Sequence, residues 1–389
     1  MIVGIPVELD PSENRVALTP AATKSLVDRG HTVLVESRAG LTARFADEEY
    51  RSVGARVVYD REEVFGRAGL LLKVAGLDSE EAGLVGEGQV VMAFHHLAAA
   101  NLGLLDRLLA RRATLIGYEI TEDARGDLPI LHAMSEIAGQ LAVHVAARYL
   151  ETRAGGRGIL LGGGIGIPPA HVVILGAGVV GIWAARTALG NGAQVTVLDT
   201  SLEALQRAEE TLRRRVVTEV AHPRAVARAV AYADVLIGAI LIPGERTPIV
   251  VTRPMVATMK PGSVVLDISI DQGGCVETSR PTHLSDPIFI EGEVIHYAVP
   301  NMASAVARTA SLALSNTSLP FVQTIADLGI EAALKESPGL RAGVYAYRGE
   351  LASGSVARSL GIGSRPSGLP PAAPRPVGGV PVREEAWSI

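Results

Sequence analysis

Short apolar runs alternate with amphipathic stretches along most of this chain, and together they form two consecutive blocks. The apolar runs have the length of buried strands, whereas the stretches between them carry apolar residues at helical spacing. In the first block, the pattern predicts strands at Ile2 to Ile5, Thr32 to Val35, Leu70 to Val74, Val90 to Ala93 and Thr114 to Tyr118. Helices are expected between these strands, and one of them runs from Pro20 to Arg29 with Thr19 as its N-cap.

The second block repeats this alternation. Strands are predicted at Val172, Gln194, Val235 and Val264, and helices at Val179 to Asn191, Leu202 to Arg213 and Pro223 to Tyr232. Strands that alternate with helices indicate parallel sheets covered by helices on both faces. The expected fold class is therefore α/β, with two doubly wound domains and a cleft between them.

The stretch from His171 to Asp199 contains the parts of a dinucleotide site in their usual order. A predicted strand precedes Gly176-x-Gly178-x-x-Gly181, a helix follows, and a second strand ends at Asp199. Glycines let the backbone approach a pyrophosphate, the helix N-terminus favours an anion, and Asp199 can accept both ribose hydroxyls. No Arg follows Asp199 to bind a 2′-phosphate, which favours NAD over NADP. A glycine turn that serves packing alone is the structural alternative.

Two longer helical stretches are expected to join the blocks, at Ala133 to Glu151 and at Ala303 to Leu328. The second can return the chain to the first block. We therefore expect a Rossmann NAD-binding domain at residues 133–303, inserted in a discontinuous Rossmann-like catalytic domain at residues 1–132 and 304–362. Residues 363–389 are rich in Pro and Gly and are expected to be a disordered tail.

Composition limits the classes of function. The chain has 389 residues, a net charge of −5 and a pI near 6.0, so it has no general attraction to nucleic acid or to an anionic membrane. Its one cysteine, Cys275, excludes an internal disulfide, argues against a thiolate metal site and suits the cytoplasm; we expect a buried, inert thiol. The apolar zone from Ile159 to Gly178 is interrupted by prolines, so no membrane span is expected.

Polar residues at predicted strand ends are the candidates for chemistry. Lys73 ends one apolar run, His95 and His96 follow another, and Asp267 and Asp271 follow a strand of the second block. Open α/β sheets bind ligands at this end of their strands. Each candidate has a structural alternative: Lys73 can reach the surface, one histidine can be a buried structural imidazole, and Asp267 can orient its loop. The residues alone indicate an NAD-dependent oxidoreductase and leave its substrate open.

Five longer segments carry a resemblance to a known family. They are GIPVELDPSENRVALTP, MSEIAGQLAVHVAARYLE, GGRGILLGGGIGIPPAHVVILGAGVVG, IGAILIPGERTPIVVTRPMVATMKPGSVVLDISIDQGGCVETSRPT and HYAVPNMASAVARTASLALSN. They resemble the alanine dehydrogenase family, which includes the related transhydrogenase α subunit. The resemblance covers residues 1–362 and implies reversible, NAD-dependent oxidative deamination of L-alanine to pyruvate and ammonia. It also implies a homo-oligomer, most often a hexamer.

The resemblance assigns roles to individual residues. It implies that Arg15 binds the substrate carboxylate, that Lys73 contacts the carboxylate and the carbonyl oxygen, and that His96 is the general acid and base. Asp271 would be the second catalytic group and would orient water or ammonia. The chemistry agrees, because a guanidinium fits a carboxylate, an ammonium polarises a carbonyl group, and imidazole titrates near neutral pH.

The same resemblance implies contacts for substrate and cofactor. Met134 and Asn301 would complete the substrate site. The cofactor site would consist of Ser135, Gly176, Gly178, Val179, Val180, Gly181, Asp199, Ile240, Ile270, Asp271, Asn301 and Met302. For Ser135, a cap at the start of a helix is an alternative role.

Three segments depart from the family pattern. KVKEP is replaced by KVAGL at residues 73–77, YLHLA by FHHLA at 94–98, and NMPGAVPRTS by NMASAVARTA at 301–310. With Ala75 and Gly76 in place of charged residues, an acid beside Lys73 is lost, which is expected to lower the pKa of that lysine. Phe94 replaces an aromatic hydroxyl, and His95 adds a second titratable group. Losing two prolines is expected to loosen a loop or to let the next helix begin earlier.

Three functions remain open on the sequence. The leading one is alanine dehydrogenase, and the second is a divergent NAD-linked amino-acid dehydrogenase or imine reductase that acts on a different 2-oxo acid. For both, the expected partners are a 2-amino or 2-oxo acid and ammonia. The third is an NAD-binding subunit of the transhydrogenase type, in which Lys73, His96 and Asp271 would have no role.

Overall fold

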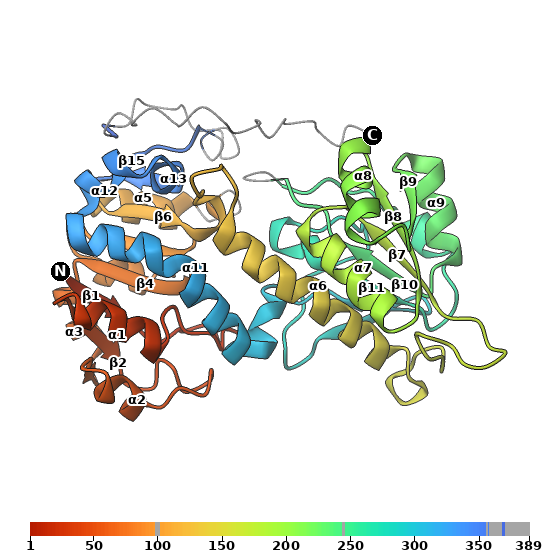
Figure 1. Cartoon of the computed structure of the whole chain (residues 1–389), viewed down its shortest axis with the longest axis horizontal. Coiled ribbons are helices and arrows are strands. Elements are labelled where there is room, and N and C mark those ends of the chain that lie inside the picture. Colours follow the sequence, from red (N-terminus) through yellow and green to blue (C-terminus); the bar gives the residue numbers. More distant parts are fainter. Residues whose placement is uncertain (98–101, 243–245, 355–356, 358–367, 370–389) are drawn as a thin grey trace. The chain divides into compact units, whose positions relative to one another are not determined.

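The computed structural model of the chain describes residues 1–97, 102–242, 246–354, 357, 368 and 369. The chain divides into two compact units, and each is described by itself. Unit 1 is Met1–Met134 with the described part of Ser304–Arg383, and unit 2 is Ser135–Ile242 with Arg246–Ala303. In Figure 1 the red, orange and blue elements belong to unit 1, and the green and cyan elements to unit 2. Apart from 368 and 369, the tail predicted at 363–389 lies outside the described residues.

The sheet of unit 1 has parallel strands in the order 3-2-1-4-5-6, extended by an antiparallel pair. From one edge to the other, the strands are β15 (Glu350–Leu351), β14 (Val344–Tyr347), β6 (Thr114–Gly117), β5 (Val90–Phe94), β4 (Leu70–Ala75), β1 (Ile2–Ile5), β2 (Thr32–Glu36) and β3 (Arg56–Val58). This order is that of dinucleotide-binding Rossmann folds, and it reverses between β1 and β4. Ligands of such sheets bind at the carboxyl ends of the strands, beside this reversal.

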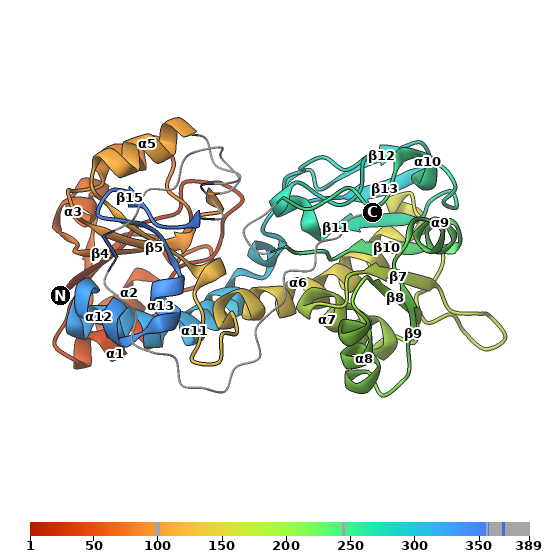
Figure 2. The same cartoon turned by 90° about the horizontal axis from the view of Figure 1, so that it is seen from above.

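Helices cover both faces of this sheet (Figure 2). On one face, α3 (Arg61–Arg67), α4 (Glu81–Leu84) and α5 (Leu102–Ala110) pack against apolar side chains of β4, β5 and β6. On the other face are α1 (Pro20–Asp28), α11 (Ala307–Leu328) and α12 (Ile330–Glu336), with the shorter α2 (Asp47–Ser52) and α13 (Pro338–Ala342) nearby. As predicted, Thr19 caps α1, because its side chain accepts from the N–H of Ala22.

The sheet of unit 2 repeats the same parallel order, with one antiparallel strand at its edge. Its strands are, in spatial order, β12 (Ile288–Glu291), β13 (Val294–Tyr297), β11 (Val264–Asp267), β10 (Val235–Gly238), β7 (His171–Leu175), β8 (Gln194–Asp199) and β9 (Val217–Val220). The reversal here lies between β7 and β10. Two Rossmann-like sheets of the same strand order therefore occur in one chain, which confirms the predicted α/β fold class.

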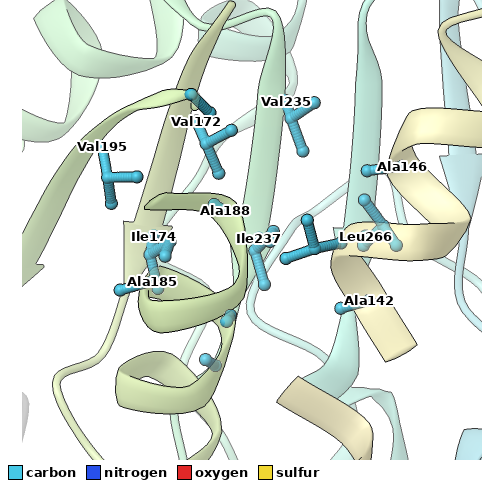
Figure 3. Packing of buried hydrophobic residues seen from close by; sticks show 14 of the residues in the cluster. Ala142, Ala146, Val172, Ile174, Ala185, Ala188, Val195, Val235, Ile237 and Leu266 are labelled. Atoms are coloured by element: carbon cyan, nitrogen blue, oxygen red, sulfur yellow. The ribbon is translucent and has the colours of Figure 1, made fainter. Parts of the chain in front are cut away.

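Small side chains let helices pack closely on the sheet of unit 2. Figure 3 shows Ala185 and Ala188 of α7 (Val179–Gly190) and Ala142 and Ala146 of α6 (Pro129–Tyr149) among the β-branched residues and leucine of the strands. This face also holds α8 (Leu202–Thr211), whereas α9 (Pro223–Tyr232) and α10 (Arg253–Val256) cover the opposite face. Alternate strand residues point to opposite faces, so strand residues between the two helix layers are predominantly apolar.

Two glycines of unit 2 are required by close backbone contacts. A Cβ on Gly181 would lie 1.9 Å from the carbonyl oxygen of Gly176, where α7 meets β7. A Cβ on Gly139 would lie 2.4 Å from the carbonyl oxygen of Val180, where α6 meets α7. No side chain fits at either position, so Gly181 has a packing role whatever the turn binds.

Most predicted elements are present, with shifted ends. β1 and α9 have the predicted bounds, and β6 ends at Gly117 because Tyr118 begins the 3₁₀ helix η2 (Tyr118–Ile120). The helix expected from Ala133 is α6, which begins earlier, at Pro129. The helix expected from Ala303 is the 3₁₀ helix η5 (Met302–Val306) followed by α11. The short strands β3, β9 and β12 to β15 are not among the predicted elements, although β14 is the fully apolar run Val344–Tyr347.

The buried His296 in β13 gives the fold a pH dependence. Its Nδ1 lies 3.1 Å from the carbonyl oxygen of Val294 and its Nε2 2.8 Å from the hydroxyl of Thr278, and burial lowers the pKa of His296. A lowered pKa contributes stability that is complete above the unfolded-state value near 6.5 and is lost as the pH falls through the folded-state pKa. We expect His296→Gln to reduce the loss of Tm between pH 7 and pH 5 by roughly 2 °C. Calorimetry at both pH values tests this, and equal losses in the two proteins would contradict it.

Candidate active site

Polar side chains gather at the carboxyl ends of four neighbouring strands in unit 1. Glu8 follows β1, Lys73 lies in β4, His96 follows β5, and Glu119 lies in η2 directly after β6. The carboxyl ends of parallel strands share one edge of the sheet, so these side chains come from one region of the unit. They provide a cation, two carboxylates and an imidazole, which is a set suited to proton transfer and to binding an anion.

Lys73 is a buried cation held between two carboxylates. Its Nζ donates to Glu8 at 2.8 Å and to Glu81 at 2.9 Å, and its side chain is 1% exposed. Burial alone would lower the pKa of Lys73, but the charges of Glu8 and Glu81 outweigh burial, so the pKa is raised. Burial also raises the pKa of Glu8, in spite of the nearby ammonium. Lys73 is therefore paired with two acids although an acid is missing after it in the sequence. The expected lowering of its pKa is relative to other family members and stays a prediction.

A bulge in β4 determines the position of Lys73. Leu72 pairs with Met92 and Ala75 with Phe94, so β4 contains one residue more than β5 in this interval. The N–H of Val74 donates to Glu8 at 2.6 Å. Glu8 therefore binds the bulged backbone through one oxygen and the lysine ammonium through the other.

Arg61 in α3 fixes the second carboxylate. Its Nη1 lies 2.8 Å from an oxygen of Glu81, and its Nη2 lies 3.2 Å from an oxygen of Glu36 at the end of β2. The same Nη2 donates to the carbonyl oxygen of Val7 at 2.7 Å. The chain of ion pairs thus runs from the β1 and β2 ends to Lys73, and it is mostly buried, where charge interactions are strong.

Arg15 is placed by a neighbouring acid and a methionine. Its Nε and Nη2 donate to the two oxygens of Glu13 at 2.7 and 2.6 Å, and both side chains are buried. Its Nη1 lies 3.4 Å from the sulfur of Met134, and its guanidinium carbon lies 5.8 Å from the centre of the Phe94 ring. The structure thus brings Arg15 and Met134, both predicted substrate contacts, into direct contact within unit 1.

The two adjacent histidines have different surroundings. His95 is buried, its Nε2 lies 3.3 Å from the carbonyl oxygen of Val91, and burial lowers the pKa of His95. His96 is partly exposed and stacks on Phe94, with ring centres 6.0 Å apart. The backbone of His96 has a φ of 46°, a left-handed conformation that costs on the order of 1 kcal/mol for a residue other than glycine. Of the pair, His96 is the residue that can meet a ligand.

The glycine-rich turn of unit 2 fits a dinucleotide. Gly176 has a φ of 106° and lies against the reversal of strand order, because a Cβ there would be 2.4 Å from the carbonyl oxygen of Ala239. Gly178 caps α7, is exposed, and has open space where a Cβ would be. The first N–H groups of a helix lack partners inside it, so Gly178, Val179 and Val180 can present N–H groups to a pyrophosphate.

Asp199 ties the turn to the end of β8. One of its oxygens accepts from the N–H of Ala177 at 2.7 Å and the other from the N–H of Ser201 at 2.8 Å. The carboxylate therefore holds the glycine turn while it stands at the position from which a ribose can be bound. Thr200 and Ser201 follow it, and neither is basic.

Asp271 and Asn301 are in contact within unit 2. Asp271 lies in the 3₁₀ helix η4 (Ile268–Gln272) after β11, and it accepts from the N–H of Asn301 at 2.9 Å. Asn301 has a φ of 52°, so this bond supports an uncommon backbone conformation for a side chain other than glycine. The loop that carries Asp271 thus touches the segment that carries Asn301 and Met302.

Asp267 orients its loop, which is the structural alternative expected for it from the sequence. It is buried at the end of β11, and its carboxylate accepts from the N–H groups of Cys275 and Val276 at 3.0 and 3.1 Å. These bonds close the loop 268–275 and so place Asp271. Cys275 is buried and free, and burial raises the pKa of its thiol well above the usual value, as expected for an inert thiol.

The remaining predicted cofactor residues belong to unit 2. Ile240 follows β10, and its N–H donates to the hydroxyl of Ser269 at 3.0 Å. Ile270 lies in η4, beside Asp271. Ser135 lies in the second turn of α6, so the alternative of a helix-start cap is wrong, because the helix begins at Pro129.

Glu8, Glu13, Glu81 and Glu119 are polar residues of this region that the sequence did not single out. Glu8 and Glu13 lie in the segment that resembles the family, and only their acidic character could have drawn attention to them. Among the described residues, no cluster of three His, Cys, Asp or Glu side chains could hold a metal ion. No helix within the described ranges is long and apolar enough to cross a membrane.

Two family models match consecutive parts of the chain. The N-terminal domain of the alanine dehydrogenase/PNT family matches residues 4–138, and its C-terminal domain matches residues 142–354. An alanine dehydrogenase of Halomonas elongata is 43% identical over 362 residues, which are 93% of this chain and 97% of that protein.

Solved structures give the same result. A structure titled L-alanine dehydrogenase is similar with a TM-score of 0.87 and 42% identity over 93% of this chain and 99% of that one. A transhydrogenase from Sinorhizobium meliloti is similar with a TM-score of 0.77 and 28% identity, over 90% of this chain and all of that one. The chain therefore belongs to the alanine dehydrogenase/PNT family of nicotinamide-dependent oxidoreductases.

Proposed function

We propose that this protein is an alanine dehydrogenase, which oxidises L-alanine to pyruvate and ammonia and catalyses the reverse amination. The observation that carries the proposal is the group of Arg15, Lys73, His96 and Met134 in one unit of a chain with this family membership. We propose that residues 1–132 and 304–362 form the catalytic domain and that residues 133–303 form the NAD-binding domain. A transhydrogenase-like subunit would leave the buried cation and the imidazole of unit 1 without a role.

Arg15 and Lys73 bind the 2-oxo acid in this proposal. Glu13 binds Nε and Nη2 of Arg15, and the sulfur of Met134 lies beside Nη1, so the guanidinium has a fixed orientation. The substrate carboxylate would bind this guanidinium, with the methyl group against Met134. Lys73 uses two of its three N–H bonds on Glu8 and Glu81, and the third can donate to the carbonyl oxygen. Its raised pKa keeps it cationic, so it polarises C2 toward attack by ammonia.

His96 is the proton donor and acceptor in the proposed reaction. In the direction of amination it gives a proton to the oxygen that leaves as water, and in the direction of deamination it accepts a proton from the attacking water. Asp271 is proposed as the second catalytic group, which orients water or ammonia through its carboxylate. Asn301 and Met302, on the segment that contacts Asp271, contribute to the substrate and cofactor contacts.

We propose NAD as the cofactor, with Gly176, Gly178, Val179, Val180 and Gly181 at the pyrophosphate. Ser135, Asp199, Ile240, Ile270, Asp271, Asn301 and Met302 would line the rest of the site. When bound, NAD supplies the hydride acceptor for C2 of alanine. Asp199 favours NAD, because an anionic carboxylate repels the 2′-phosphate of NADP. A cytoplasmic location and a homo-oligomer, a hexamer by family resemblance, belong to the same proposal.

The first test measures NADH oxidation with ammonia and a panel of 2-oxo acids. We expect pyruvate to be preferred and His96→Ala to lower kcat by about a hundredfold or more, because general acid and base catalysis is lost. His31→Ala is the matched control, since His31 pairs with Asp327 away from this region and its loss leaves kcat unchanged. A preference for a larger 2-oxo acid would assign the protein to the divergent class, and an unaffected His96→Ala variant would remove His96 from the mechanism.

Glu81, one of the two acids that bind Lys73, should affect the high-pH limit of activity. Glu81→Gln removes one of the charges that raise the pKa of Lys73. Burial lowers this pKa and is then opposed by fewer charges, so the pKa falls. We expect the high-pH limb of the kcat/KM profile to move to lower pH in this variant. Glu36→Gln is the control, because Glu36 also pairs with Arg61 but does not contact Lys73. Equal profiles for Glu81→Gln and wild type would refute the need for a cationic Lys73.

Asp199 should decide between the two dinucleotides. Asp199→Asn keeps an oxygen for the N–H of Ala177 and loses the negative charge. We expect its Kd for NADH to rise about tenfold, the cost of a hydrogen bond to a charged group, while NADPH binds more tightly than to wild type. Titration of both cofactors by calorimetry measures this. An equal rise of the Kd for NADH and for NADPH would show that Asp199 only supports the turn.

A further inference from the structure

The left-handed backbone of His96 needs partners that hold it. A residue other than glycine keeps such a conformation only where its surroundings determine it. The ring stack with Phe94 involves the side chain and leaves the backbone free to turn. The backbone of His96 is instead held through its N–H, which donates to an oxygen of Glu119 at 2.7 Å.

Glu119 is itself held from the far end of the chain. The hydroxyl of Tyr345 in β14 donates at 2.9 Å to the same oxygen that accepts from His96. Glu119 is 6% exposed and Tyr345 is 2% exposed, so these bonds form out of contact with water and are correspondingly strong. Burial and the adjacent Glu119 raise the pKa of Tyr345, so its hydroxyl keeps the proton that it donates.

Gly117 makes room for this arrangement. It lies between β6 and η2, and a Cβ there would come within 2.3 Å of the Tyr345 ring and 3.0 Å of the second oxygen of Glu119. The aromatic ring therefore occupies the place of the missing side chain. β14 pairs with β6 beside this position, which fixes the ring above the end of the strand.

We propose that Glu119 is a positioning residue for His96 and that Tyr345 locks Glu119 in place. The proposal rests on the proposed function, in which His96 is the acid and base. It also gives a role to the antiparallel strand β14, which the parallel Rossmann order does not need, because β14 brings one hydroxyl to the carboxylate that orients the catalytic histidine. An imidazole displaced by a fraction of an ångström transfers protons less efficiently, although substrate and cofactor still bind.

The test compares single substitutions in the full-length protein. We expect Tyr345→Phe to lower kcat with pyruvate by about tenfold, whereas KM for pyruvate and Kd for NADH stay within about twofold of wild type. Tyr347→Phe is the matched control, because Tyr347 is a buried tyrosine of the same strand whose ring faces Arg348, and its kcat should equal that of wild type. Glu119→Ala should lower kcat by about a hundredfold, and Glu119→Gln, which keeps an acceptor for the N–H of His96, should recover part of the loss.

A double substitution separates positioning from support of the fold. If Tyr345 acts through His96, adding Tyr345→Phe to His96→Ala should leave the residual single-turnover rate unchanged. A wild-type kcat in Tyr345→Phe would overturn the proposal, and so would a tenfold loss that persists without His96 or that also appears in Tyr347→Phe. A wild-type protein that does not turn over pyruvate would instead contradict the proposed function, so the two failures are distinct.

Discussion

The polar groups at the strand ends of unit 1 depend on the ion pairs of the buried Lys73 ammonium. A lysine at 1% exposure is stable only if anions surround it, and two carboxylates from different elements meet it there. One of these acids also binds the backbone of the bulge that turns Lys73 into place, and the other is fixed by Arg61. Removing a charge from such a network leaves the others buried and unpaired, so the whole edge of the sheet has to be formed as one arrangement.

In unit 2 the equivalent constraint is steric. The carbonyl oxygen of Gly176 leaves no room for a side chain at Gly181, and this contact brings α7 against β7. Gly178, two residues beyond Gly176, meets nothing at the position of a Cβ and faces outward. The glycines of one motif thus serve opposite purposes: some bring protein groups together, and Gly178 leaves the backbone accessible to a ligand. Asp199 holds the turn through Ala177 and is the residue that we propose for the ribose.

The sequence predicted what local pattern and motif spacing determine. The two β/α blocks, the cap at Thr19 and the glycine turn are short-range features, and the structure contains them. The sequence could not predict that Glu81 and Glu8 meet Lys73, because those contacts depend on the bulge in β4, on the loop after β1 and on the position of α4. The contact of Tyr345 with Glu119 joins residues 226 positions apart, and the apolar run Val344–Tyr347 does not reveal which strand it pairs with. Long-range polar contacts of this kind appear only once the topology is known.

The structure also changes how the departures from the family pattern should be interpreted. Loss of an acid at residues 75–77 does not leave Lys73 without anions, because Glu8 and Glu81 bind its ammonium. Gly76 instead lies against the backbone of His95, where a Cβ would be 3.3 Å from its Cα and would contact the segment that leads into His96. Phe94 packs between the rings of Tyr118 and His96 and below the guanidinium of Arg15. These substitutions therefore act on the shape of the region around His96 and Arg15, and we expect any difference from relatives to appear in the size of the 2-oxo acid that is accepted.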